Sequence, residues 1–202
     1  SAKLAGVDKF IYASTCSVYG VGSNILDEEA PLNPVSLYAK TKISSEESIM
    51  GIADGNFKPV IMRMSTLYGF SPRMRFDLVV NTMTMTAYTE GRINVFGGNQ
   101  WRPLLSLPDA AEAYLKVLQN EQAAGKIYNV GSEEQNYVIS DVAKLVAKGI
   151  KEVSGKDIPV NIEGDSVDVR DYRVSFKKIQ SELRFTVKHS INSAAAEIWG
   201  KL

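Results

Sequence analysis

Residues 10–20 read FIYASTCSVYG, and this stretch decides the fold class. Its first part, residues 10–14, is short, apolar and rich in strand-favouring residues, which is typical of a strand buried on both faces of a parallel sheet. A helical pattern follows over 37–53, and the apolar run PVIMRMS at 59–65 predicts a second strand. This order of elements predicts a βαβ unit and therefore an α/β protein.

The rest of the chain also alternates between helical and strand patterns. Ser140 is expected to be the N-cap of the helix that follows it, because its hydroxyl can accept a hydrogen bond from a free amide of the first turn. Composition marks no domain boundary and no repeat. The predicted helices are 78–88, 106–120, 140–153, 176–183 and 191–199, and the predicted strands are 93–97, 126–132 and 158–163.

Composition excludes several classes of protein. Of the 202 residues, 23 are Lys or Arg and 23 are Asp or Glu, and no block of like charges favours a nucleic-acid or membrane partner. A single cysteine, Cys16, and a single histidine, His189, are too few for a structural metal cluster, and we expect both to be packed or solvated. The single cysteine favours a reducing cytoplasm, and no apolar run approaches the roughly 20 residues of a membrane span, so we expect a soluble protein.

Tyr38 and Lys42 stand four positions apart in SLYAKTK, residues 36–42. On a helix this spacing places both side chains on one face, where the ammonium group favours the phenolate form of the tyrosine. The same spacing is common on helix surfaces, so the pair alone leaves a structural role open. Hydroxyl and thiol groups at residues 14–17 follow the first strand, and open α/β sheets bind ligands beyond the carboxyl ends of their strands.

Six motifs occur in an order that resembles one family. They are ASTCSVYG, DEEAPLNP, YAKTK, RMSTLYG, WRPLLSLPDAAEA and YNVGS. The chain is similar over nearly its whole length to the extended short-chain dehydrogenase/reductases, specifically the NAD-dependent nucleotide-sugar epimerases and dehydratases. The resemblance implies the C-terminal part of a Rossmann-type doubly wound parallel sheet with a small α/β substrate-binding domain. Residues 1–70 would belong to the NAD-binding domain and 71–202 mainly to the substrate domain, with 100–130 returning to the first.

The resemblance also implies a catalytic set. Tyr38 matches the catalytic acid/base, and Lys42 matches the residue that binds the nicotinamide ribose of NAD. Thr15 falls at the catalytic serine or threonine position, and Ser14 joins Tyr38 and Lys42 as an expected cofactor contact. These residues would pass a hydride and a proton between the sugar and NAD.

The two residues after Thr15 discriminate between reactions. Dehydratases of the family carry an Asp-Glu pair there, whereas this chain has Cys16 and Ser17, which cannot supply the additional acid and base. The resemblance therefore favours epimerisation of a nucleotide-diphosphate sugar through a keto intermediate. A nucleotide-sugar reductase or dehydrogenase, and a non-catalytic sugar-nucleotide-binding module, remain open alternatives.

Substrate contacts are implied along the second half of the chain. Arg102 matches a position that pairs with the diphosphate, and an arginine fork suits phosphate. Asp168 aligns with a ribose-binding aspartate, while Asp165 stands at an arginine position that Arg170 or Arg173 could replace. Arg73 and Arg75 could form a lid over phosphate or be solvated loop charges. The expected substrate contacts are Thr15, Cys16, Ser17, Thr66, Asn94, Val95, Phe96, Arg102 and Asp168.

A glycine-rich phosphate-binding turn does not occur in this sequence. Residues 20–22, Gly-Val-Gly, run into an acidic segment rather than opening a helix. We therefore expect the chain to correspond to the C-terminal part of a longer enzyme, through truncation, proteolysis or completion by a separate partner polypeptide, and we favour truncation. Such a part would expose an unpaired sheet edge and bind NAD weakly or not at all. The resemblance implies a homodimer for the full-length enzyme.

Overall fold

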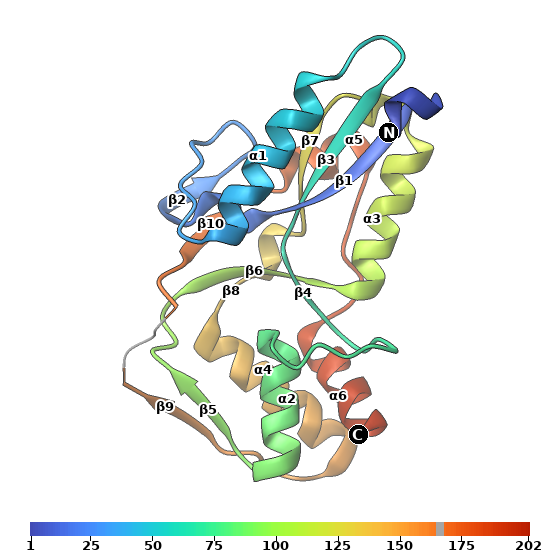
Figure 1. Ribbon diagram of the computed structural model, residues 1–202. Coiled ribbons are helices and arrows are strands. Elements are labelled where there is room, and N and C mark those ends of the chain that lie inside the picture. The colour runs from blue at the N-terminus through green and yellow to red at the C-terminus, as the bar shows by residue number, and fades with distance from the viewer. Residues whose placement is uncertain (165–167) are drawn as a thin grey trace.

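The computed structural model describes residues 1–164 and 168–202 (Figure 1). The strands are β1 Lys9–Thr15, β2 Val21–Leu26, β3 Lys58–Met64, β4 Thr66–Tyr68, β5 Ile93–Phe96, β6 Trp101–Ser106, β7 Ile127–Val130, β8 Asn136–Val138, β9 Val160–Glu163 and β10 Asp171–Val174. The α-helices are α1 Leu37–Gly51, α2 Val79–Glu90, α3 Leu107–Gln119, α4 Ile139–Ser154, α5 Lys177–Leu183 and α6 Ile191–Lys201. Short 3₁₀ helices are η1 Lys3–Ala5, η2 Cys16–Tyr19, η3 Glu121–Ala123 and η4 Glu133–Gln135.

A parallel three-stranded sheet in the order β1-β3-β7 positions the candidate site. Side chains alternate between its faces, so Arg63 points toward α1, where it pairs with Glu46. Val60 and Met62 point to the opposite face, where they share a hydrophobic cluster with Val117 of α3 and with α5. The predicted βαβ unit β1-α1-β3 is confirmed, and so is the α/β class.

The remaining strands form three small sheets. β4, β6 and β8 form one sheet, β2 pairs with β10 and β5 pairs with β9, both in parallel. Figure 1 shows α2, α4 and α6 grouped together at the C-terminal end of the molecule, away from the β1-β3-β7 sheet. β2, β4, β6, β8 and β10 were not predicted from the sequence.

The expectation that Ser140 is an N-cap is wrong. α4 begins at Ile139, and its N-cap residue, Val138, makes no side-chain capping bond. The physical reason is that Val138 still pairs with Trp101 as the last residue of β8, so the chain passes directly from strand to helix. Ser140 therefore lies inside the first turn. By contrast, the hydroxyl of Ser106 accepts a hydrogen bond from the amide of Asp109 at 3.1 Å and caps α3.

Among the described residues, buried apolar side chains form two hydrophobic clusters. The first joins the β1-β3-β7 sheet to α3 and α5, and it includes Val60, Tyr128 and Phe176. The second lies among α2, α4 and α6, and it includes Val142 and Ile198. Within the described ranges, no helix is both long enough and apolar enough to span a membrane.

Candidate active site

The carboxyl end of β1 turns sharply into η2. Thr15 is 9% exposed, and its hydroxyl oxygen accepts a hydrogen bond from the backbone amide of Ser17 at 3.1 Å. The Ser17 hydroxyl lies 3.5 Å from the Tyr172 hydroxyl of β10. Residues 15–17, predicted from the sequence as substrate contacts, are thus held in one compact turn at the end of the strand.

Tyr38 and Lys42 lie on the first turns of α1, which is capped by the hydroxyl of Ser36. The Lys42 ammonium group donates a hydrogen bond to the carbonyl oxygen of Ala13 at 2.7 Å, and it lies 5.7 Å from the centre of the Tyr38 ring. It also lies 4.8 Å from the centre of the Tyr12 ring. Tyr38 is 56% exposed. A ligand can therefore reach the phenol, while the lysine is held against the strand that carries Thr15.

The Ser14 side chain lies on the face of the sheet that packs against α1. It is 4% exposed, and its hydroxyl donates a hydrogen bond to a carboxylate oxygen of Glu46 on α1. The hydroxyl that we expected to contact a cofactor is therefore bound to Glu46.

Glu46 also pairs with Arg63, and sequence reasoning missed both residues. The Nη2 and Nε atoms of Arg63 lie 2.8 and 3.2 Å from the same oxygen of Glu46. The Nη1 atom donates to the Tyr19 hydroxyl at 3.0 Å, and this hydroxyl donates to the side-chain oxygen of Asn129 at 2.7 Å. Burial opposes the charge of Arg63, but the hydrogen bonds that Arg63 donates to Glu46 and Tyr19 and the electrostatic attraction of these two groups together outweigh it and raise the arginine pKa.

Cys16 is a buried side chain, as expected, with 1% of its surface exposed. Its thiol donates a hydrogen bond to the carbonyl oxygen of Arg63 at 3.1 Å. Burial raises the pKa of the Cys16 thiol to about 12. The group is therefore neutral at physiological pH and supplies neither an acid nor a base for catalysis there.

Arg102 and Asp168 come together although 66 positions separate them in the sequence. Arg102 is 4% exposed, and its Nη2 atom lies 2.9 Å from a carboxylate oxygen of Asp168. Asp168 is also bound by Arg170 at 2.7 and 2.8 Å. Partial burial opposes ionisation of Asp168, but hydrogen bonds from Arg170 and Arg102 lower its pKa below the usual range.

Aromatic rings flank these arginines. The Cζ atom of Arg102 lies 5.5 Å from the centre of the Tyr172 ring, and the Cζ atom of Arg173 lies 5.2 Å from the centre of the Trp101 ring. Arg102 thus stacks on Tyr172, and the ring of its neighbour Trp101 is paired with Arg173. Asp165, at the expected arginine position, lies outside the described residues.

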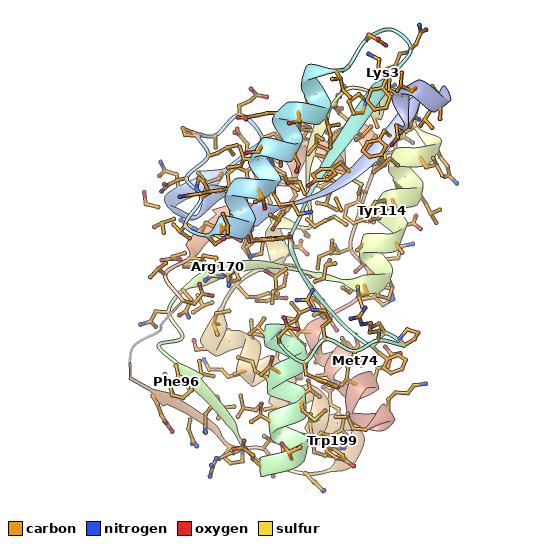
Figure 2. All side chains as sticks on the ribbon, viewed as in Figure 1. Lys3, Met74, Phe96, Tyr114, Arg170 and Trp199 are labelled. Carbon is orange, nitrogen blue, oxygen red and sulfur yellow. The ribbon has the colours of Figure 1, made fainter. Side chains whose placement is uncertain are left out.

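The expected nucleotide-base segment lies on β5. Phe96 is 59% exposed, whereas Val95 is 2% exposed and packs in the second hydrophobic cluster. The side-chain oxygen of Asn94 accepts a hydrogen bond from Asn161 at 3.1 Å. Figure 2 shows Phe96 and Arg170 on the same side of the molecule. Thr66 is half-buried at the start of β4.

Two further groups were singled out in the sequence. In the loop before α2, Arg75 pairs with Asp77 at 2.6 Å on the surface. His189, expected to be packed or solvated, has a side chain that is 47% exposed, and its Nδ1 atom lies 2.9 Å from a carboxylate oxygen of Asp109. The Asp109 carboxylate also accepts hydrogen bonds from the amides of Lys188 and His189, which join α3 to the start of α6.

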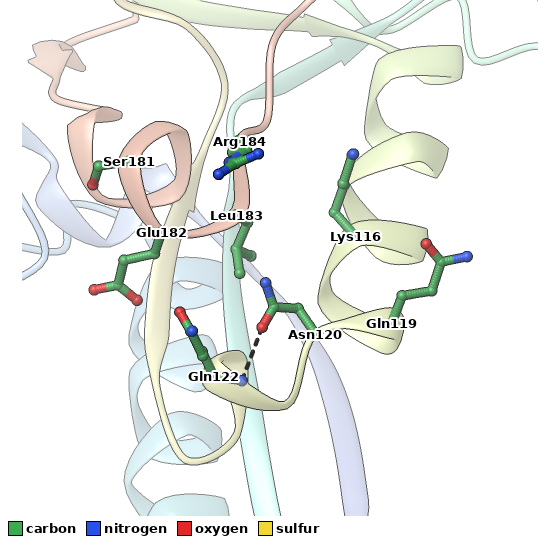
Figure 3. A pocket seen from close by; sticks show the side chains of 8 residues that line it. All are labelled: Lys116, Gln119, Asn120, Gln122, Ser181, Glu182, Leu183 and Arg184. Carbon is green, nitrogen blue, oxygen red and sulfur yellow. Dashed lines mark hydrogen bonds between the residues drawn. The ribbon is translucent and has the colours of Figure 1, made fainter.

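A polar hollow of about 660 Å³ lies between α3 and α5 (Figure 3). None of the predicted site residues lines it. Its lining residues are Lys116, Gln119, Asn120, Gln122, Ser181, Glu182, Leu183 and Arg184. In the described part of the chain, no group of three or more His, Cys, Asp or Glu side chains could hold a metal ion.

Comparison with known proteins decides the family. The model of the NAD dependent epimerase/dehydratase family matches residues 1–131, more than half of the chain. This chain belongs to the NAD-dependent epimerase/dehydratase family. The resemblance in the motifs around Thr15, Tyr38 and Lys42 is thus confirmed at the level of the family.

Relatives within this family include enzymes of different reactions. A dTDP-D-glucose 4,6-dehydratase from Mus musculus is 34% identical over 156 residues, which are 75% of this chain and 42% of that protein. A Bacillus subtilis protein described as an uncharacterized UDP-glucose epimerase is 30% identical over 152 residues, 74% of this chain and 46% of that protein. The chain spans about half the length of the curated relatives it matches.

A solved structure shows the same fold. The UDP-glucuronic acid 4-epimerase from Bacillus cereus, in complex with UDP-glucuronic acid and NAD, superposes with a TM-score of 0.79 at 25% identity. The match covers 96% of this chain and 60% of that one. The fold is therefore that of a family whose members bind NAD and UDP-sugars.

Proposed function

We propose that this chain carries the catalytic residues of an NAD-dependent nucleotide-sugar epimerase. The observation that carries the proposal is the hydrogen bond of Lys42 to Ala13, which holds the helix of Tyr38 against the strand that ends at Thr15. The helix that carries the exposed phenol and the ammonium group is thus bound to the strand that carries the Thr15 hydroxyl, which supports a common site. Ligands of open α/β sheets bind at such strand ends.

Each residue has a distinct part in the proposed reaction. Tyr38 removes the proton from a sugar hydroxyl as the adjacent carbon is oxidised, and it returns the proton after the keto sugar has turned. Lys42 lowers the cost of the phenolate charge, and Thr15 donates a hydrogen bond to the reacting oxygen. NAD, when bound, supplies the hydride acceptor.

Epimerisation is favoured over dehydration because of the residues after Thr15. Elimination of water requires an acid and a base beyond Tyr38. The Cys16 thiol is buried and has a raised pKa, and the Ser17 hydroxyl lies against Tyr172. Neither group can exchange a proton with a sugar carbon at neutral pH, which argues against the reaction named for the mouse relative.

For the substrate, we propose that Arg102 binds the diphosphate of a nucleotide sugar. Its guanidinium group is nearly buried, and its partner Asp168 has a side chain that is 40% exposed to solvent. Asp168 would bind the ribose, and exposed Phe96 with its neighbours Asn94 and Val95 would surround the base. Thr66 remains a proposed contact near the diphosphate.

The chain's own residues fit one end of NAD. Lys42 uses one of its three N–H donors on Ala13, and the remaining donors, with the exposed Tyr38 hydroxyl, suit the ribose of the nicotinamide. The sequence has no glycine spacing suited to the pyrophosphate. NAD binding by a longer polypeptide is therefore part of the proposal.

The proposal also includes a division of the chain into domains. We assign residues 1–70 to the C-terminal part of a Rossmann-type NAD-binding domain and 71–202 mainly to a substrate domain, with 100–130 returning to the first. The first hydrophobic cluster supports the return of residues 100–130, because it joins residues of β3 to residues of α3 and β7, and it also includes residues of β10 and α5, which lie within 71–202. A homodimer of the whole enzyme is also proposed.

The test is an assay of this chain, and of the longest natural polypeptide that contains it, with NAD and a panel of UDP- and dTDP-sugars. NMR of the products should show inversion at one carbon without net consumption of NAD. Tyr38→Phe should lower turnover by about 10²–10⁴-fold, whereas Tyr88→Phe, an exposed tyrosine of α2, should not. Net conversion of NADH or NADPH would indicate a reductase, and binding without turnover would indicate a non-catalytic module.

A further inference from the structure

Three polar side chains form a buried row across the β1-β3-β7 sheet. Ser14 pairs in register with Arg63, and Arg63 pairs with Asn129. Paired residues of parallel strands share a face, so all three side chains lie on the face where Arg63 meets Glu46 of α1. Their exposed fractions are 4%, 4% and 0%. A buried polar row of this kind is unusual, because the buried positions of parallel strands are mostly apolar.

Glu46 of α1 inserts its carboxylate into this row. It accepts hydrogen bonds from the Ser14 hydroxyl and from the Nε and Nη2 atoms of Arg63. Tyr19 completes the network by linking Arg63 to Asn129. The polar atoms of the Glu46–Arg63 pair therefore have partners without solvent, and both side chains are about 95% buried.

Two hydrogen bonds, one helical turn apart, thus join α1 to β1. Lys42 binds the carbonyl oxygen of Ala13, and Glu46, one turn later, binds the side chain of the next strand residue, Ser14. Tyr38, Lys42 and Glu46 follow each other at intervals of four residues on one helix face. The hydrogen bond between Lys42 and Ala13 is exposed to solvent, so it can change when a ligand binds. The hydrogen bond between Glu46 and Ser14 is buried.

We propose that Glu46 and Arg63 are positioning residues, which fix the rotation and height of α1 so that Tyr38 and Lys42 meet the end of β1. This inference rests on the proposed function. A buried ion pair can often be replaced by apolar side chains without loss of stability, so stability alone does not account for the pair. Directional hydrogen bonds define one helix placement, whereas apolar contacts tolerate sliding.

The first experiment needs no turnover. The ¹⁵N signal of the Lys42 ammonium group, identified by its loss in Lys42→Arg, reports the bond to Ala13 in the labelled 202-residue chain. Glu46→Gln should shift or abolish this signal, whereas Glu47→Gln, the same change at the adjacent exposed position, should leave it in place. An unchanged signal in Glu46→Gln would overturn the proposal.

The second experiment separates positioning from folding. The double variant Glu46→Leu, Arg63→Met replaces the pair by apolar side chains and should keep the thermal unfolding midpoint of the parent. In the polypeptide that turns over nucleotide sugar, it should lower kcat about 100-fold and change KM less than about 3-fold, because small misplacements of catalytic groups have effects of this size. A folded double variant with the kcat of the parent would show that the pair is only structural.

The two experiments also distinguish failure of the positioning proposal from failure of the proposed function. A parent polypeptide without turnover on any nucleotide sugar would remove the proposed function. The Lys42 signal would still decide whether Glu46 fixes α1.

Discussion

Arg63 and Arg102 both lie on strands, are both 4% exposed and both pair with a carboxylate, yet their surroundings differ. The partner of Arg63, Glu46, has a side chain that is 5% exposed, whereas the partner of Arg102, Asp168, is 40% exposed. Arg63 therefore belongs to a closed network that no ligand enters. Arg102 belongs to an open one, in which we propose that an anionic ligand competes with Asp168.

Burial of a charge therefore does not by itself mark a binding residue. What separates the two arginines is the accessibility of the partner. A buried carboxylate partner makes the ion pair a structural element. A solvent-exposed carboxylate partner can be replaced on the arginine by another anion.

Removal of Glu46 should have the largest effect on stability. Glu46→Leu leaves the Arg63 charge buried without its counter-ion, which should lower the free energy of unfolding by about 3–5 kcal/mol. Asp168→Leu should cost roughly 1–2 kcal/mol, because Arg102 keeps its bond to the carbonyl of Trp101 and its place over Tyr172. Urea unfolding of both variants measures the difference, and equal losses would contradict the comparison.

The sequence predicted the apolar strands and helices of this region but not the closed network. The strand over 59–65 was recognised by its apolar run, and Arg63 was its one charged residue. Its partner lies 17 positions earlier, on a helix whose rotation over the sheet is fixed only by tertiary packing. A charge inside an apolar strand was the available signal, together with a glutamate four positions after Lys42.

The pairing of β2 with β10 was also beyond sequence reasoning. Residues 21–26, VGSNIL, contain glycine, serine and asparagine and read as a loop. They form a strand because β10, about 150 residues later, supplies the backbone partners. In contrast, Arg102 and Asp168 were singled out by the family resemblance, although the sequence alone could not show that they pair with each other.

Replacement of Arg102 should mainly weaken binding. Arg102→Met removes the proposed contact with the diphosphate and should raise the Kd for a UDP-sugar about 10–100-fold, since a charge-assisted hydrogen bond contributes about 1.5–3 kcal/mol. Isothermal titration of the NAD-loaded polypeptide measures the change. Arg92→Met, at an exposed arginine paired with Glu90, is the matched control and should leave the Kd unchanged. Equal affinity in Arg102→Met would exclude Arg102 as the diphosphate ligand.

Acidification should affect the open pair in a defined pH range. The pKa of Asp168 is lowered in the folded state, so its ion pairs stabilise the protein above the unfolded pKa of about 3.9 and are lost as pH falls through the lower folded value. Asp168→Asn should therefore be less stable than the parent at pH 6, and the difference should disappear at the acid end of a series below pH 4. The effect should be small because solvent screens the half-exposed carboxylate.

Denaturant unfolding at several pH values measures this difference. Asp141→Asn, at an exposed aspartate of α4 that pairs with Lys144, serves as the control for a surface ion pair. If the stability gap between parent and Asp168→Asn stayed constant from pH 6 to the acid end, the linkage argument for Asp168 would fail.

The smallest expected effect lies at the edge of the closed network, at Glu28. Its carboxylate accepts a hydrogen bond from the amide of Asn129 at 2.8 Å, but burial raises its pKa above the ordinary value. The folded state therefore holds the proton more tightly, and stability falls as pH rises from the unfolded pKa through the folded one. Glu28→Gln keeps the acceptor without the charge and should gain about 0.5 kcal/mol at pH 7 but nothing at pH 4. Glu29→Gln, at the exposed neighbour, should show no such pH-dependent gain, and a loss of stability in Glu28→Gln at pH 7 would mean that the closed network needs this carboxylate in its charged form.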